Sequence, residues 1–216
     1  MKDYGTYRRH VWALPIELGM AAGVVVTFLQ QDWKHFLTAI FTLAVSFLPL
    51  AHERLFRVRL PAVVQFAYVA FIFASMFAGE VLGMYGRFAP YDDIVHCSSG
   101  LLVGLGAVLI LVDLKRRGVK LPPWLQSVMV LMTGASVAAL WEIIEFTSDR
   151  LFGTFSQGND LGDTMFDLID GSGFALIVAL LHVAYLRGHE RVLGVFVRRY
   201  EQLNDPLTFA SQEKVE

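Results

Sequence analysis

The sequence predicts an all-α membrane protein, a polytopic bundle of six transmembrane helices. Of its 216 residues, 55% are hydrophobic and 18% are charged, whereas soluble domains average about 45–50% apolar and about 25% charged residues. The mean hydropathy is +0.51. Apolar segments near the roughly 20 residues that cross a bilayer recur along the chain, and basic residues alternate between the loops that join them.

The six predicted spans are separated by short polar segments. The first follows basic residues and resembles a signal peptide, but its apolar run continues through Val24-Val25-Val26 without a persuasive small-x-small cleavage site, so we expect an uncleaved anchor. Pro61 and the pair Pro122-Pro123 mark helix starts, because the amide hydrogen that proline lacks would be unpaired there anyway. The predicted spans are 12–29, 35–51, 61–84, 94–112, 124–146 and 165–186.

The basic residues predict the orientation. Only Lys34, Arg87 and Arg150 of the 18 basic residues lie in one set of loops. Because basic residues resist translocation, the loops with the other 15 are expected to be cytoplasmic, as are both termini. These 15 are Lys2, Arg8, Arg9, Arg54, Arg57, Arg59, Lys115, Arg116, Arg117, Lys120, Arg187, Arg191, Arg198, Arg199 and Lys214. We therefore expect a six-helix transmembrane domain over 1–186 and a cytoplasmic C-terminal tail over 187–216.

Charge and cysteine content exclude several functions. A net charge of -2 offers no basic face for phosphates, so no nucleic-acid partner is predicted. The single cysteine, Cys97, forms no internal disulfide, and no Cys/His zinc pattern occurs. On the outer side, however, 11 of the 20 acids gather. Acids contribute little to membrane insertion rules, so this excess needs its own cause.

Acidic residues and one histidine gather at three predicted helix ends. Within the fifth span the carboxylates are spaced i, i+3, i+7, which places them on one helix face. The hairpin after that span is short, so spans five and six are expected to be neighbours with facing carboxylates. The residues are Asp92, Asp93 and His96 at the outer start of span four, Glu142, Glu145 and Asp149 at the outer end of span five, and Asp163, Asp167 and Asp170 at the outer start of span six.

These carboxylates indicate a divalent metal site. A carboxylate at membrane depth costs ~2.5–3.5 kcal/mol, so it persists when paired, protonated, hydrated or bound to a cation. Oxygen ligands suit Mg, Ca or Mn, and a histidine also admits Zn; no organic cofactor is predicted. The predicted metal ligands are Asp93, His96, Glu142, Glu145, Asp163 and Asp167, and the predicted catalytic residues are His96, Glu142 and Asp167.

Other roles remain open for some residues. Asp160 and Asp163 could cap the sixth span, and Asp149 could be solvated or pair with Arg150. Three Gly-x-x-x-Gly pairs could pack helices within the bundle or form a homo-oligomer seam. These pairs are Gly19 with Gly23, Gly79 with Gly83, and Gly100 with Gly104.

Three strings carry a family resemblance. They are Tyr91-Asp92-Asp93-Ile94-Val95-His96, Trp141-Glu142-Ile143-Ile144-Glu145-Phe146 and Gly162-Asp163-Thr164-Met165-Phe166-Asp167-Leu168-Ile169. Over about residues 85–185 the chain resembles the YjdF-like family of bacterial inner-membrane proteins, and more distantly the VanZ-like group. VanZ-like proteins usually have Glu, Gln and then Arg at the second string, so the YjdF-like group is the closer match. The resemblance implies a fold and a location in the bacterial inner (cytoplasmic) membrane, but no reaction.

The sequence is compatible with three functions. The first is a metal-dependent hydrolase or transferase, or a metal-dependent binding site, for a membrane lipid or lipid-linked envelope substrate. The second is a cation- or proton-coupled transporter, although the acids gather at one face and no matching pair of interrupted helices occurs. The third is a noncatalytic scaffold whose acids bind cations to hold the helix ends together.

Overall fold

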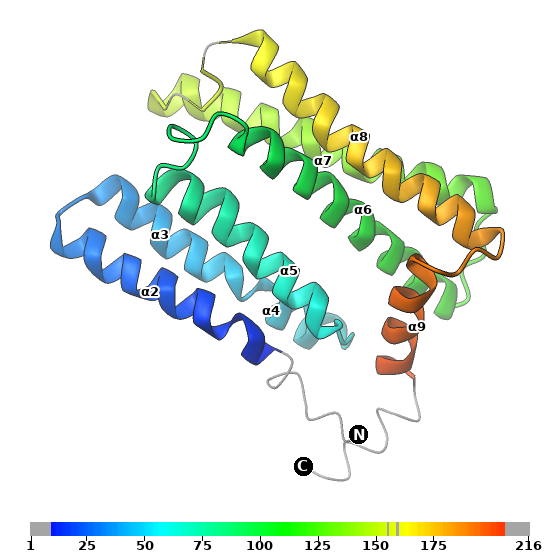
Figure 1. Ribbon diagram of the computed structural model, residues 1–216. Coiled ribbons are helices and arrows are strands. Elements are labelled where there is room, and N and C mark those ends of the chain that lie inside the picture. The colour runs from blue at the N-terminus through cyan, green and yellow to red at the C-terminus, as the bar shows by residue number, and fades with distance from the viewer. Residues whose placement is uncertain (1–9, 155, 159, 206–216) are drawn as a thin grey trace, which may run out of the picture. The chain divides into compact units, whose positions relative to one another are not determined.

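The computed structural model is helical and contains no strand in the residues it describes, 10–154, 156–158 and 160–205 (Figure 1). Of the basic residues that predict the orientation, Lys2, Arg8, Arg9 and Lys214 lie outside this part of the chain. The elements are η1 (Val11–Ala13), α2 (Leu14–Leu29), α3 (Trp33–Ser46), α4 (Leu48–Phe56), α5 (Ala62–Ile72), η2 (Phe73–Val81), α6 (Tyr91–Arg116), α7 (Pro123–Phe152), α8 (Leu161–Leu186) and α9 (Leu193–Leu203).

The described residues contain six helices long and apolar enough to cross a membrane. They confirm the predicted all-α fold and the number of spans. Several of these membrane-spanning segments consist of two consecutive elements. One example is η2, a π-helix that continues α5. The six are Val11–Leu29, Trp33–Phe56, Ala62–Val81, Tyr91–Arg116, Pro123–Phe152 and Leu161–Leu186.

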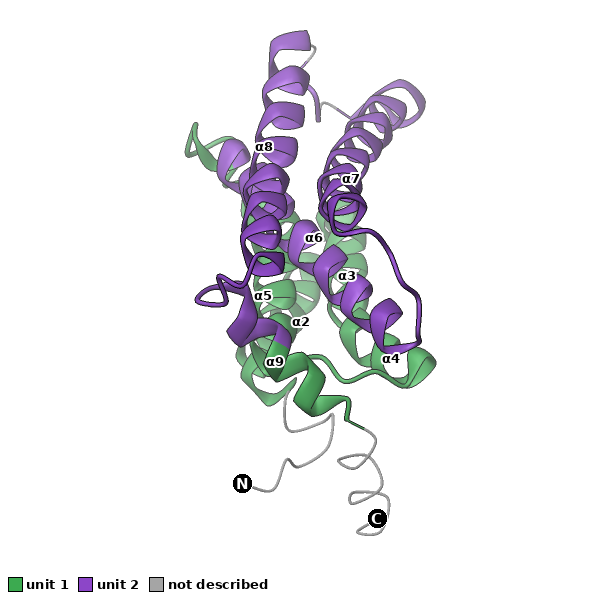
Figure 2. Cartoon of the chain, turned by 90° about the vertical axis from the view of Figure 1, so that its right-hand side faces the viewer, with its two compact units in different colours: residues 1–91, 198–216 green, residues 92–197 purple. Residues whose placement is uncertain are grey.

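The chain divides into two compact units (Figure 2). Unit 1 comprises residues 1–91 and 198–216, and unit 2 comprises residues 92–197. Unit 2 therefore contains almost all of α6 together with α7 and α8, and helix α9 begins in unit 2 and ends in unit 1. The segment 187–216 expected to be a tail thus includes a helix.

Unit 1 is built around a small apolar core from η1, α2, α3, α5 and η2. Met20, Ala39 and Val69 are fully buried in it. The turn between α4 and α5 is fixed by the carboxylate of Glu53, which accepts the amide hydrogen of Leu60 and, at 2.8 Å, the side-chain amide of Gln65. Apolar packing thus holds these helices together, and hydrogen bonds fix the turn that connects two of them.

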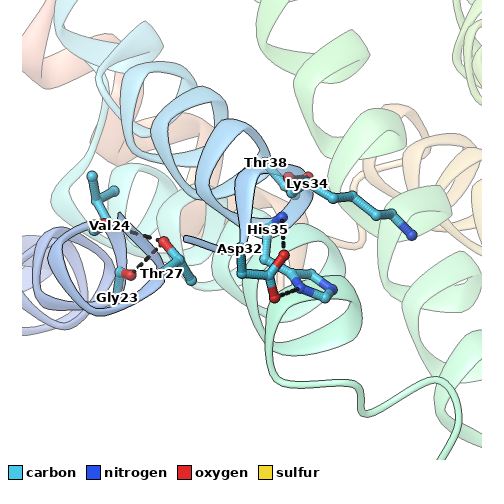
Figure 3. A network of polar contacts seen from close by, with 7 residues as sticks. All are labelled: Gly23, Val24, Thr27, Asp32, Lys34, His35 and Thr38. Carbon is cyan, nitrogen blue, oxygen red and sulfur yellow. Dashed lines mark hydrogen bonds and ion pairs between the residues drawn. The ribbon is translucent and has the colours of Figure 1, made fainter. Parts of the chain in front are cut away.

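Local sequence signals set the helix ends. Asp32 caps α3: its Oδ1 accepts the His35 amide at 3.3 Å, and its Oδ2 lies 2.5 Å from His35 Nδ1 (Figure 3). The hydrogen bond from the His35 side chain holds the pKa of the Asp32 carboxyl below its usual value. Pro61 and Pro122 are the N-cap residues of α5 and α7, which confirms the helix starts predicted from proline.

Small residues let the helices of unit 2 pack closely. A Cβ on Gly104 would lie 2.9 Å from Val178 Cβ, and a Cβ on Gly134 would lie 2.2 Å from Ala175 Cβ. Gly104 therefore packs against a helix of its own unit. This agrees with packing within the bundle, one of the two roles predicted for its Gly-x-x-x-Gly pair. The prediction for Gly79 and Gly83 is wrong, because Gly83 follows the end of η2 with φ +70 and shares no helix face with Gly79.

Candidate functional site

Three helices of unit 2 meet at Gly100, Gly171 and Ala138. A Cβ on Gly100 would lie 2.2 Å from the Gly171 carbonyl oxygen, and a Cβ on Gly171 would lie 2.9 Å from Ala138 Cβ. His96 and Asp167 each precede one of these glycines by four residues, at the ends where α6 and α8 begin. The close backbone contact therefore brings both side chains together one turn away, since residues four apart share a helix face.

Three side chains lie together at this end of unit 2, those of Asp92, His96 and Asp167. We call them the acid/His cluster. His96 Nε2 lies 3.4 Å from Asp92 Oδ1 and 3.7 Å from Asp167 Oδ1. One potential ligand atom from each of the three side chains lies within 4.8 Å of the others, the one such grouping among the described residues. His96 is 5% exposed and Asp167 is 3% exposed, so the cluster is largely shielded from solvent.

Glu142 of α7 lies beside this cluster. It is 5% exposed and close enough to His96 and Asp92 to interact with both electrostatically. Its Oε2 accepts a hydrogen bond from Gln157 Nε2 at 3.2 Å, whereas its buried Oε1 has no hydrogen-bond partner among the described residues. A buried acceptor without a partner costs about 1–3 kcal/mol, so this oxygen is a candidate ligand or base.

The hairpin between α7 and α8 folds back over Glu142. Asp149 fixes it by accepting hydrogen bonds from Thr154 Oγ1 at 2.6 Å, from the Ser156 amide at 2.8 Å and from the Gln157 amide at 3.1 Å. Gln157 in turn donates its side-chain amide to both the carbonyl and the carboxylate of Glu142, each at 3.2 Å. Asp149 is therefore neither simply solvated nor paired with Arg150, the two alternatives that its sequence position suggested.

A cavity of about 580 Å³ opens next to Glu142 between α7 and α8. Its polar lining includes Gln157 and Arg150, and its apolar lining includes Ile143 and Phe146, which are exposed on α7. The Arg150 guanidinium carbon lies 5.2 Å from the centre of the Phe146 ring, and Arg150 forms no ion pair with any described residue. The lining of the cavity thus combines a guanidinium group without an ion-pair partner among the described residues, the buried carboxylate of Glu142 and an apolar surface.

The other predicted site residues surround the cluster less closely. Glu145 is half-buried and accepts a 2.9 Å hydrogen bond from the indole of Trp141. Asp163 is half-buried and interacts electrostatically with Asp92 and His96. Asp93 is exposed and outside the three-residue group. Capping of α8 falls to Asp160, whose Oδ1 accepts the Gly162 amide at 2.8 Å.

Sequence reasoning missed Asp92 as a member of the group and Gln157 as a neighbour of Glu142. A signal for Asp92 exists, because it precedes His96 by four residues and shares its helix face, whereas Asp93 is offset by one position. Gln157 lies in the hairpin, where no helical period applies. Its role depends on the path that Asp149 imposes on the chain.

Comparisons with known proteins agree with the membrane fold. The family model described as "Predicted membrane protein (DUF2238)" matches residues 13–188. A Thermotoga maritima protein named "Uncharacterized protein" is 26% identical over 124 residues, which are 57% of this chain and 64% of that protein. This chain thus spans less than two thirds of that relative's length. No solved structure matches the chain.

The family match fits the resemblance to the YjdF-like group, whereas the comparisons add nothing for the more distant VanZ-like likeness. It covers the five spans from Trp33 to Leu186 and most of the first, including the two helices that carry the acid/His cluster and the helix that carries Glu142. The chain belongs to the DUF2238 family of predicted membrane proteins.

Proposed function

We propose that this protein is a metal-dependent hydrolase or transferase of the bacterial inner membrane that acts on the phosphorylated headgroup of a lipid or lipid-linked envelope substrate. Asp92, His96 and Asp167 hold a divalent cation, and Glu142 acts beside it as the base. Both termini lie in the cytoplasm, and the acid/His cluster faces the outer side. The observation that carries the proposal is the buried, unpartnered Oε1 of Glu142 next to the cluster.

Charge balance supports a bound cation. The cluster and Glu142 comprise three carboxylates and one imidazole, and the ion pairs of Asp92 and Asp167 within the described residues go to His96 alone. Like charges this close in a poorly hydrated place repel strongly unless a cation or protons separate them. A dication supplies two positive charges to oxygen and nitrogen ligands that suit Mg, Mn, Ca or Zn.

The position along the helices supports a headgroup substrate. Helix α7 has 30 residues and is therefore about 45 Å long, whereas the hydrocarbon layer is about 30 Å thick. Trp124, in its first turn, is 66% exposed and suits an interfacial anchor. About 20 residues further on the helix reaches the opposite boundary, so Glu142 lies near the depth of lipid phosphates.

The cavity beside Glu142 supports the same class of substrate. Arg150 offers an unpaired guanidinium for a phosphate oxygen, and exposed apolar residues of α7 offer a surface for the acyl or prenyl chain. A cation held by Asp92, His96 and Asp167 would supply Lewis-acid polarisation of a phosphoryl oxygen. In hydrolysis, Glu142 takes a proton from the attacking water while the water oxygen bonds to phosphorus. The bond from phosphorus to the leaving-group oxygen breaks, and its electron pair stays on that oxygen.

The test uses purified full-length protein in detergent and combines metal analysis with turnover. We expect a stoichiometric divalent metal by element analysis and a melting temperature that chelator lowers and one of Mg, Ca, Mn or Zn restores, since a ligand of the folded state stabilises it. We also expect phosphate release from phosphatidic acid or a polyprenyl diphosphate. Glu142→Gln should abolish turnover, whereas the control Glu80→Gln, at an exposed acid of η2, should not.

Each failure has a different meaning. Absence of metal together with melting that is indifferent to chelator removes the cation from the proposal. Bound metal without turnover of either substrate leaves a metal-fastened scaffold. Metal- or proton-dependent ion flux in sealed vesicles would instead make the protein a transporter.

A further inference from the structure

A second cavity lies at the other end of α6, remote from the acid/His cluster. Its volume is about 380 Å³, and it is formed where α6 ends and the chain turns into α7. Lys115 and Lys120 provide its charge, and Leu111, Val119 and Leu121 provide its apolar lining. About 20 residues, or roughly 28 Å along the helix, separate Lys115 from His96, so the two sites share no residue.

The turn between the helices directs both lysines to the same cavity. Helix α6 ends at Arg116, and Gly118 then adopts φ +87, a left-handed conformation that suits glycine. The Val119 amide closes the turn on the Leu114 carbonyl at 3.0 Å. Gln126 Nε2 also donates a 2.9 Å hydrogen bond to the Leu121 carbonyl. The backbone carbonyls of Leu114 and Leu121 near the cavity are therefore already hydrogen-bonded within the protein.

The lysines of the cavity are free to bind an anion. The side-chain ammonium groups of Lys115 and Lys120 form no ion pair or hydrogen bond with any described residue, although the Lys115 backbone carbonyl accepts the Gly118 amide at 3.0 Å. By contrast, Arg117, which does not line the cavity, is bonded to Asp113 with 2.6 Å between Nε and Oδ2. The unpaired charge of this loop therefore faces the cavity, where two ammonium groups lie beside an apolar floor that includes the buried Leu111.

We propose that this cavity binds the headgroup of an anionic phospholipid, with Lys115 and Lys120 on the phosphate and the first part of an acyl chain on Leu111 and Val119. Basic pockets between transmembrane helices suit anionic headgroups because charge and apolar surface lie side by side at the interface. A free phosphate ion would satisfy the lysines but would leave the apolar lining exposed to water. The combination of both therefore favours a lipid.

The experiment measures lipid retention and melting of the full chain in detergent with added phosphatidylglycerol, phosphatidylcholine or glycerol phosphate. We expect phosphatidylglycerol to remain bound in native mass spectrometry and to raise the melting temperature, and the other two to do neither. In the double variant Lys115→Gln, Lys120→Gln the affinity should fall about 25-fold, since each lysine near an anionic headgroup contributes about fivefold. Lys115→Arg with Lys120→Arg should retain binding.

The matched control is Arg116→Gln with Arg117→Gln, which removes the same charge from the same loop but from residues that do not line the cavity. It should retain most of the lipid affinity. Equal losses in the two glutamine double variants would overturn the proposal in favour of diffuse attraction to a basic loop. Equal stabilisation by glycerol phosphate would show an anion site without lipid selectivity, and unchanged lipid binding in the lysine variant would place the lipid elsewhere.

Discussion

Gly100 and Gly171 are in direct backbone contact, so close that a methyl group on Gly100 would lie 2.2 Å from the Gly171 carbonyl oxygen. Helices α6 and α8 can approach to this distance because Gly100 carries no side chain, whereas a Cβ on Gly171 would instead meet Ala138 of α7, 2.9 Å away. His96 and Asp167 lie one turn from these glycines, and the distance between their side chains depends on this contact. The packing of small residues and the chemistry of the acid/His cluster are therefore coupled.

A methyl group at this contact should weaken both the helix packing and the binding of metal by the acid/His cluster. We expect Gly100→Ala to lower the free energy of unfolding by about 1–3 kcal/mol, the usual cost of overpacking, and to weaken metal binding by separating His96 from Asp167. The measurements are thermal melting in detergent and metal titration. Gly106→Ala, on the same helix with nothing within 4 Å of its added Cβ, is the control and should lower neither stability nor metal affinity, since alanine favours a helix more than glycine does. Equal effects of the two variants would contradict the coupling.

Removing charge from the site should preserve the fold. In metal-free protein, Glu142→Gln and Asp167→Asn should be as heat-stable as the wild type or more so, because each removes a crowded negative charge. Turnover should nevertheless fall. Melting in chelator, followed by size-exclusion chromatography, checks the fold. If both variants lose cooperative melting at neutral pH, the acids are needed to hold the helices and the structural role is favoured.

The cap of α3 should make stability depend on pH. The folded-state pKa of Asp32 is lowered by its hydrogen bond from His35, so its charge stabilises the fold above the unfolded-state pKa of about 3.9. That contribution is lost as the pH falls through the lower folded-state value. Asp32→Asn keeps a good cap but no charge. The melting temperatures of the two proteins should therefore differ near pH 6 and converge once the pH has fallen below the folded-state pKa of Asp32; a constant difference would contradict the assignment.

The topology can be checked with fusions. A reporter active only in the cytoplasm should work when fused after Lys120 or at the C-terminus, because the excess of Lys and Arg predicts that these segments are cytoplasmic. It should fail when fused near Asp160. Activity at Asp160 would reverse the orientation, and would place the acid/His cluster on the cytoplasmic side.

The number of membrane-spanning helices could be predicted from the sequence because lipid imposes a length and a composition on each of them. Helix starts such as that of α7 could be predicted because proline marks them. The sequence was also sufficient to bring His96, Asp167 and Glu142 to one end of unit 2. It was insufficient for the partner of His96, since Asp92 and Asp93 are adjacent and only the helix register separates them.

Loop geometry was the other obstacle. Asp149 had an obvious neighbour in Arg150, but three donors of the hairpin compete for its oxygens and bind them instead. Such bonds depend on where the chain turns, which no periodic pattern encodes. The bond from Gln157 to Glu142 follows from that turn, and for this reason it had no signal in the sequence.

The π-helix η2 has a consequence for how sequences of this family are compared. Its hydrogen bonds span five residues instead of four, so each turn over Phe73–Val81 holds more residues than an α-helical turn. A relative with ordinary α-helical turns in this segment would cover the same distance with fewer residues. A gap in an alignment at this point therefore records a change in winding, and the span on both sides of it keeps its length across the membrane.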